Sequence, residues 1–253
     1  MTSEKRSNLW WHLARPNQCA AFTLLCFPYA GGNASIFRSW QSTLPDSVDV
    51  CGIQLPGRMN RFLEPPFRRL PDLVRELAPA LLPLLERPFI FFGHSMGATL
   101  SFEVARWLRR SRKIVPRLLI VSGRRAPQVP DTNPPIHLMN DADFLGRIRE
   151  RNGPSTELLC NPELLPLLLP ALRADTELSE TYRYVDEPPL ACPITAFAGA
   201  NDCDESADQM REWRVQTTNR FSLHCIDGDH FFIHSNERQL LNLLGMELTR
   251  FLL

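Results

Sequence analysis

Short apolar runs alternate with longer amphipathic segments along most of this chain. Six runs of strand length are apolar on both faces, as strands buried inside a parallel sheet are: residues 22–27, 48–55, 88–92, 117–122, 193–198 and 221–226. Between and after them, helices are predicted at residues 70–85, 96–110, 206–216 and 236–252. The alternation predicts one α/β domain over residues 1–253, with a mostly parallel central sheet flanked by helices.

One region, residues 130–188, breaks this alternation. It separates the fourth predicted strand from the fifth, and it is rich in helix formers and proline, with no clear strand. Because a compact domain does not carry so long a structureless loop, we expect helices at residues 141–151, with Asp141 as the N-cap, and at 162–184. An insertion between late strands would lie over the carboxyl ends of the sheet, where open α/β folds bind ligands. We therefore predict a helical lid insertion over residues 130–188.

The sequence Gly93-His94-Ser95-Met96-Gly97 lies between a predicted strand and a predicted helix. It fits the G-x-S-x-G pattern of a nucleophile elbow, in which a sharp strand-to-helix turn exposes the serine in a strained conformation. Side chains in place of Gly93 or Gly97 would collide with the neighbouring strand and helix. The pattern predicts that Ser95 is a nucleophile and that the chain has an α/β-hydrolase fold.

An acid and a histidine should follow the serine along the chain, each in a loop after a strand. Asp202 and Asp204 come after the fifth predicted strand, and His230 comes after the sixth. We choose Asp202 over Asp204 because it lies closer to the end of its strand. Neutral His230 would accept the proton of Ser95, while Asp202 would fix the imidazole tautomer and stabilise its charged form. The sequence therefore predicts a catalytic triad of Ser95, Asp202 and His230.

Two backbone N–H groups are needed to stabilise the oxyanion of an acyl-transfer intermediate. One should belong to Met96, the residue after the nucleophile. The other should come from the loop after the first strand, where Gly31 and Gly32 allow the backbone to approach a ligand closely. We choose Ala30 as the second donor; the loop by itself is also compatible with a simple glycine turn.

Composition excludes several other classes of protein. The 28 basic and 28 acidic residues cancel, which argues against a nucleic-acid-binding face. The most apolar stretch, residues 77–92, is interrupted by prolines and charged residues, so no membrane span is predicted. The seven cysteines form no C-x-x-C motif, and His230 and His234 have no third ligand cluster, so we expect no metal site. We expect a cytoplasmic protein that is monomeric and uses no cofactor.

Four stretches of the chain resemble type II thioesterases, the external editing enzymes of non-ribosomal peptide and polyketide assembly lines. They are CFPYAGGNASIFRSW, QLPGRMNRFLEPP, FFGHSMGATLSFEVAR with VSGRRAP, and LLPLLLPALRADTELSETYRY leading into PLACPITAFAGANDCD and GDHFF. The resemblance runs from about Trp10 to the C-terminal helix, with departures at Met59 and Cys203. It maps the family's triad and oxyanion donors onto the same residues that were chosen above: Ser95, Asp202, His230, Ala30 and Met96.

The resemblance implies a substrate that the residues alone do not supply. Enzymes of this family hydrolyse acyl or aminoacyl thioesters on the phosphopantetheine arm of carrier proteins, which removes stalled or wrongly primed chains. The family's flexible lid maps onto the stretch that contains Leu172-Arg173-Ala174-Asp175. Arg58 and Arg61 are expected to brace their loop by salt bridges, with the arm's phosphate or an acidic carrier protein as the alternative contact.

Three other functions are compatible with parts of the sequence. A chain-releasing thioesterase or cyclase would share the triad, but it is usually fused to a carrier domain, and none is expected before Trp10. A lipase or carboxylesterase would use the same groups on oxygen esters. A non-catalytic carrier-protein-binding module would have no need of all three triad residues.

Overall fold

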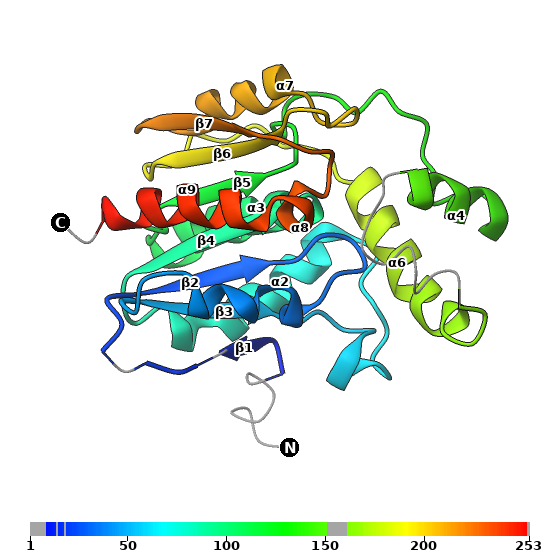
Figure 1. Cartoon of the computed structure of the whole chain (residues 1–253), viewed down its shortest axis with the longest axis horizontal. Helices are drawn as coiled ribbons and strands as arrows, with labels where there is room; N and C mark the ends of the chain where they lie inside the picture. The colour runs from blue at the N-terminus through cyan, green and yellow to red at the C-terminus, as the bar shows by residue number, and fades with distance from the viewer. Residues whose placement is uncertain (1–8, 14, 18, 151–160, 252–253) are drawn as a thin grey trace.

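A seven-stranded sheet forms the centre of the molecule (Figure 1). The computed structural model describes residues 9–13, 15–17, 19–150 and 161–251. The strands are β1 (Trp11–Leu13), β2 (Phe22–Phe27), β3 (Val48–Ile53), β4 (Phe89–His94), β5 (Leu119–Ser122), β6 (Ile194–Gly199) and β7 (Phe221–Ile226). Their order is β1-β3-β2-β4-β5-β6-β7; β1 pairs antiparallel with β3, and all the other pairs are parallel. The predicted parallel sheet is confirmed, and β1 is an addition to it.

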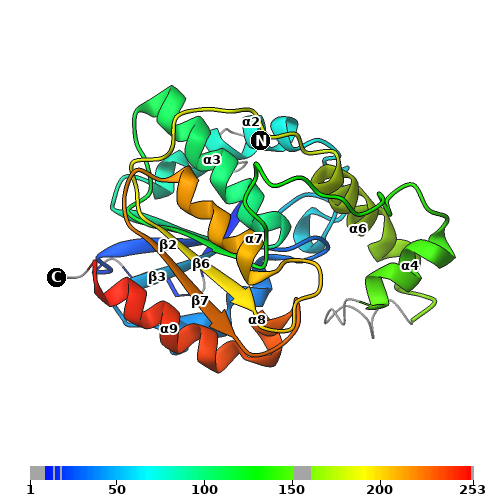
Figure 2. The same ribbon diagram turned by 90° about the horizontal axis from the view of Figure 1, so that it is seen from above.

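Both faces of the sheet are buried, which explains the continuous apolar runs. Leu25 and Phe27 of β2 join one core cluster with helices α2 (Leu70–Leu81) and α3 (Met96–Arg112). Leu24 and Cys26 join a second cluster with helix α9 (Glu237–Thr249). Figure 2 shows these helix layers from above. The helices of the main body are α2 (Leu70–Leu81), α3 (Met96–Arg112), α7 (Ala207–Arg211), α8 (Phe232–Ser235) and α9 (Glu237–Thr249), with short 3-10 segments at Ala34–Phe37, Ser39–Ser42, Met59–Arg61, Leu82–Leu84 and Glu212–Gln216.

Two further helices, α4 (Asp141–Glu150) and α6 (Leu165–Glu180), lie outside the layered body, beside the carboxyl ends of the strands (Figure 1). They share a small apolar cluster that includes Phe144 and Leu172. Helices therefore occur in the region where the sequence predicts them, but Asp141 is not the N-cap of α4. Asn140 has that role, because its Oδ1 accepts a hydrogen bond from Asp143 N at 3.0 Å. Asp141 lies in the first turn, and the predicted end at residue 151 is outside the described residues.

Across the described ranges, none of the helices combines the length and apolar character that crossing a bilayer requires.

Candidate active site

Ser95 occupies the turn between β4 and α3 in a strained backbone conformation. Its φ is 53° and its ψ is −119°, and a conformation of this kind costs about 1–3 kcal/mol in a residue other than glycine. Two backbone hydrogen bonds hold the turn: Ser95 N donates to Ser122 O at 2.8 Å, and Ala98 N donates to Ser95 O at 3.0 Å. The strain is thus maintained by β5 on one side and by the first turn of α3 on the other.

The two glycines of the elbow are required by close backbone packing. A Cβ atom on Gly93 would lie 2.1 Å from the carbonyl oxygen of Gly97, and one on Gly97 would lie 2.1 Å from that of Phe27. Both distances are far below van der Waals contact and the obstacle is backbone, so neither position accepts a side chain without displacing a strand or the helix. The steric reason given by the sequence pattern is confirmed.

His230 and Asp202 converge on Ser95 from the loops after β7 and β6. His230 Nε2 lies 3.0 Å from Ser95 Oγ, and His230 Nδ1 lies 2.8 Å from Asp202 Oδ2. Because ionised Asp202 can only accept a hydrogen bond, Nδ1 carries the proton and Nε2 is free to accept one from the serine. The His230 and Asp202 side chains are largely buried, at 9% and 1% exposure. The predicted serine, acid and histidine therefore form one connected hydrogen-bonded row.

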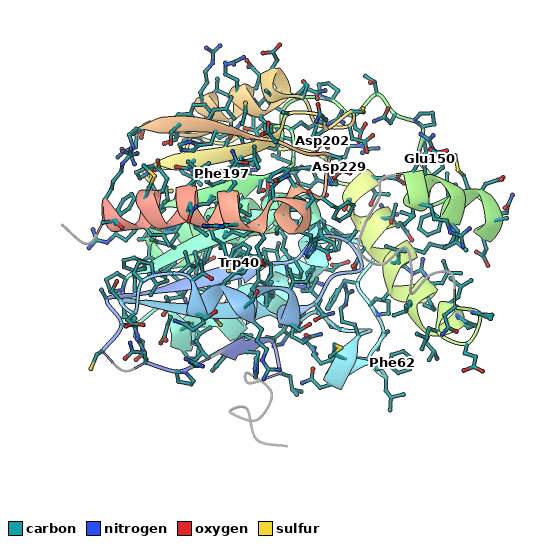
Figure 3. All side chains as sticks on the ribbon, viewed as in Figure 1. Trp40, Phe62, Glu150, Phe197, Asp202 and Asp229 are labelled. Atoms are coloured by element: carbon teal, nitrogen blue, oxygen red, sulfur yellow. The ribbon has the colours of Figure 1, made fainter. Side chains whose placement is uncertain are left out.

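Asp202 is itself held in place by the loop that follows it. Its Oδ1 accepts hydrogen bonds from Asp204 N at 2.9 Å and from Glu205 N at 3.1 Å, which leaves Oδ2 to face the imidazole. Asp204 contributes a backbone donor to this arrangement, in agreement with the choice of Asp202 as the acid. Figure 3 shows Asp202 and Asp229, which precedes His230, at the same end of the sheet.

His94 holds the backbone of His230, a contact that the sequence does not reveal. It is fully buried, and its Nε2 lies 3.0 Å from the carbonyl oxygen of His230. A carbonyl can only accept, so Nε2 carries the proton and Nδ1 accepts the hydroxyl hydrogen of Ser122, at 2.9 Å. Burial, aided by the neighbouring His230 and His234, lowers the pKa of His94 well below its usual value and keeps the ring neutral. His234, which also lies near His94, is hydrogen-bonded through its Nε2 to Tyr29 Oη at 2.9 Å.

The two chosen oxyanion donors flank Ser95 at the same edge of the sheet. Met96 is the first residue of α3, where N–H groups lack partners within the helix. Ala30 lies in the turn after β2, and β2 pairs with β4 so that Phe27 stands opposite Gly93. Within the described part of the chain, no hydrogen-bond acceptor is seen for Ala30 N. The assignment of both N–H groups as oxyanion donors stays a prediction.

Arg58 and Arg61 are buried, at 7% and 5% exposure, and both brace the loop after β3. Arg61 pairs with Glu64 at 2.6 Å and lies over the ring of Trp10, while Arg58 pairs with Asp175 at 2.6 Å. The expected bracing role is confirmed. Since neither guanidinium is free at the surface, the alternative contact with a phosphate or an acidic protein would need the loop to open.

Comparison with known proteins places this arrangement in a family. The thioesterase domain family matches residues 22–247, nearly the whole described molecule. The chain belongs to the thioesterase domain family. It is therefore a thioester-hydrolysing enzyme of the α/β-hydrolase fold, as the nucleophile elbow and the resemblance to type II thioesterases predict.

Individual relatives agree with the family. The gramicidin S biosynthesis protein GrsT of Aneurinibacillus migulanus is 41% identical over 98% of this chain and 97% of its own. The type II thioesterase BorB from the borrelidin biosynthetic cluster has a similar structure, with a TM-score of 0.87 and 34% identity over 95% of this chain and 98% of BorB. This thioesterase thus resembles proteins of antibiotic biosynthesis along its full length.

One relative has a name that points to another reaction. A protein of Brevibacillus parabrevis called linear gramicidin dehydrogenase LgrE is 49% identical over 92% of this chain and 90% of its own. Dinucleotide-binding α/β folds use a G-x-G-x-x-G turn to bring the backbone close to the pyrophosphate. The glycines of this thioesterase nowhere have that spacing, and the turn after β4 is occupied by the Ser95 elbow instead. Hydrolysis is therefore the reaction that its residues support.

Proposed function

We propose that this thioesterase removes misprimed or stalled acyl and aminoacyl chains from the phosphopantetheine arm of carrier proteins, in non-ribosomal peptide or polyketide biosynthesis. The observation that carries the proposal is the hydrogen-bonded row of Ser95, His230 and Asp202, with distances of 3.0 and 2.8 Å. The similarity to GrsT and BorB supports the biosynthetic setting.

The geometry supports a role for each group in acylation. His230 Nε2 accepts the proton of Ser95 Oγ as the oxygen attacks the thioester carbonyl carbon, and Asp202 stabilises the imidazolium. The carbonyl oxygen becomes an oxyanion, which accepts hydrogen bonds from Met96 N–H and Ala30 N–H. Collapse of the intermediate breaks the carbon–sulfur bond, and His230 gives its proton to the leaving thiolate. The acyl group is then an ester on Ser95.

Deacylation repeats these steps with water as the nucleophile. His230 removes a proton from the water as it attacks the Ser95 ester, and then returns a proton to Ser95 Oγ, which restores the free enzyme and releases a carboxylic acid. Residues 130–188, with α4 and α6, are the proposed lid over this site, and opening of the lid would admit the long pantetheine arm.

The compartment, oligomeric state and partners of the enzyme belong to the same proposal. In the described residues all six cysteines are free thiols, which supports a reducing compartment such as the cytoplasm. We propose a monomer that binds the carrier protein only transiently, without nucleic acid or membrane as partner. The competing candidates are hydrolysis of oxygen esters and programmed release of a finished chain, which require the same triad.

Release of a radiolabelled acetyl group from a phosphopantetheinylated carrier protein tests the proposal. The wild type should release acetate, and Ser95→Ala should release none while it still binds the carrier protein, because only the nucleophile is lost. If the wild type cleaves a simple oxygen ester but leaves the acetylated carrier protein intact, the carrier-protein function is wrong. If Ser95→Ala retains release with both substrates, Ser95 is not the nucleophile.

A further inference from the structure

A buried ion pair ties α6 to the loop that follows β3. Arg58 Nη1 donates to Asp175 Oδ2 at 2.6 Å, and Arg58 Nη2 donates to Asp175 Oδ1 at 2.9 Å. The two side chains are 7% and 3% exposed. Desolvation of two charges offsets most of their attraction, so a buried pair adds little net stability over apolar residues of similar size. Its fixed, bidentate geometry is the feature that needs an explanation.

The same two side chains also hold the turn after β2. Asp175 Oδ2 accepts a hydrogen bond from Gly31 N at 2.7 Å, and Arg58 Nη1 donates to the carbonyl oxygen of Gly32 at 3.0 Å. Leu172, one turn earlier on α6, packs on this turn, since a Cβ on Gly31 would lie 2.9 Å from Leu172 Cδ1. One face of α6 therefore rests on the segment that contains Ala30.

The hydrogen bond to Gly31 determines the orientation of a peptide group. Gly32 N donates to Tyr29 O at 2.9 Å, and Gly31 has a φ of +77°, which together define a type II turn with Ala30 and Gly31 at its centre. Type I and type II turns differ by a flip of the central peptide, which carries the Gly31 N–H. Because Asp175 accepts that N–H, it favours the type II orientation, and a flip would point the Ala30 carbonyl oxygen at a carboxylate.

We propose that Arg58 and Asp175 are positioning residues for the reaction. Through them α6 holds the Tyr29–Gly32 turn closed. The closed turn fixes the Tyr29–Ala30 peptide, whose carbonyl oxygen accepts from Gly32 N, so that Ala30 N–H is directed at the oxyanion. The proposal rests on the assignment of Ala30 as an oxyanion donor in the proposed function. It has a specific consequence: the oxyanion hole is complete only while α6 is seated on the turn, so the position of α6 controls the chemistry.

Asp175→Asn is the test, because it keeps the size of the side chain. The amide replaces one acceptor oxygen by an NH2 donor, which faces Arg58 Nη2 in one orientation and both Arg58 Nη1 and the Gly31 N–H in the other. It therefore cannot reproduce all three hydrogen bonds of the carboxylate, and it removes the charge that holds Arg58. Glu177→Gln is the matched control: Glu177 lies on the same helix and pairs with Arg68 at 2.6 Å, and among the described residues no hydrogen bond or ion pair joins its side chain to the turn. Both variants would be assayed on p-nitrophenyl acetate and on the N-acetylcysteamine thioester of acetate.

Asp175→Asn should lower kcat by about 10- to 100-fold on both substrates, somewhat less than outright removal of an oxyanion donor. KM should change by less than about 3-fold, because the ground-state carbonyl gains little from the donor. The inhibition constant of an acetyl-like trifluoromethyl ketone, whose adduct with Ser95 carries an oxyanion, should rise by the same factor as kcat falls. Glu177→Gln should match the wild type in all three measurements.

Three results would overturn the proposal. They are an unchanged kcat in folded Asp175→Asn, an effect on KM alone, and an equal loss of kcat in Glu177→Gln. If Asp175→Asn does not fold, the double variant Arg58→Met/Asp175→Leu replaces the charges with apolar groups of similar volume. The double variant should fold, because it leaves no buried charge unpaired. It should keep the loss of kcat, because it removes the acceptor for Gly31 N–H. Full activity in this variant would also refute the proposal.

The oxygen ester keeps this test separate from the carrier-protein function. An oxyanion forms during attack on either ester, so loss of kcat on p-nitrophenyl acetate in Asp175→Asn supports the positioning role even if no acyl carrier protein is a substrate. Conversely, release of acetate from a carrier protein by wild type and Asp175→Asn at equal rates would support the proposed function and refute the positioning role.

Discussion

The buried, neutral His94 should make the folded protein sensitive to mild acid. Its pKa in the folded state lies well below the ordinary value because burial disfavours the charged ring. The unfolded chain exposes His94 and protonates it near pH 6.5, while the folded protein does not. The contribution to stability is therefore complete above about pH 7.5 and is lost progressively as the pH falls through 6.5.

The size of this effect follows from proton linkage. If the folded state does not protonate His94 over this range, protonation of the unfolded state lowers the free energy of unfolding by about 1.4 kcal/mol between pH 7.5 and 5.5. Urea unfolding of the wild type and of His94→Gln at these two pH values measures it. The variant should be less stable at pH 7.5, and its stability should fall less between the two pH values, by that same 1.4 kcal/mol or so.

Ser122→Ala is the control for this experiment. It removes the hydroxyl that His94 Nδ1 contacts at 2.9 Å, but it leaves the buried imidazole in place. The free energy of unfolding should therefore be lower at both pH values, while the difference between the two pH values should persist. Equal acid sensitivity in the wild type and in His94→Gln would show that His94 is protonated in the folded state or is not buried, and the reasoning would fail.

Two further perturbations test other parts of the structure. Asp202→Asn should lower kcat for thioester hydrolysis by about 10⁴-fold, because the amide favours the wrong imidazole tautomer. Asp204→Asn should stay within about 3-fold of the wild type, since the substitution keeps the backbone N–H that donates to Asp202 Oδ1. The second perturbation is modification by a disulfide-exchange reagent in a Cys160→Ser background, followed by mass spectrometry. The exposed thiols should be modified rapidly and the buried thiols should not react before unfolding. The reason is that burial raises the pKa of the buried thiols, that of Cys192 to about 12. Reaction of a buried thiol as fast as an exposed one would contradict the core packing. The exposed set is Cys19, Cys203 and Cys225, and the buried set is Cys26, Cys51 and Cys192.

The parallel sheet could be predicted because β2 to β6 are local runs of buried residues, and β7, at the edge of the sheet, is a run of strand length that is mostly half-buried. Two of the predicted runs, 22–27 and 221–226, coincide with β2 and β7. β1 could not be predicted, since it has only three residues, with an exposed His12 at its centre, and it exists because β3 offers an open edge. The sequence prediction places the N-cap of α4 one residue too late. Asn140 and Asp141 are both good capping residues, and local sequence does not choose between them.

The candidate site also has parts that local sequence predicts and parts that it does not. Ser95, Asp202 and His230 could be chosen from the elbow motif and from the order of the loops, which depend only on sequence near each residue. The contacts that support them join distant parts of the chain: His94 to His230 across 136 residues and Arg58 to Asp175 across 117. Residue type and spacing contain no information about such pairs, which are fixed only when the sheet brings its strand ends together.

The position of α4 and α6 in the chain has an evolutionary consequence. They are inserted between β5 and β6, which are parallel hydrogen-bonded neighbours in the sheet, so the sheet fixes where the connection leaves β5 and where it enters β6, whatever its length. Doubling the length of such an insertion costs only about 0.6 kcal/mol in chain entropy. A lineage can thus lengthen, shorten or replace this segment while the sheet and the row of Ser95, His230 and Asp202 are inherited intact.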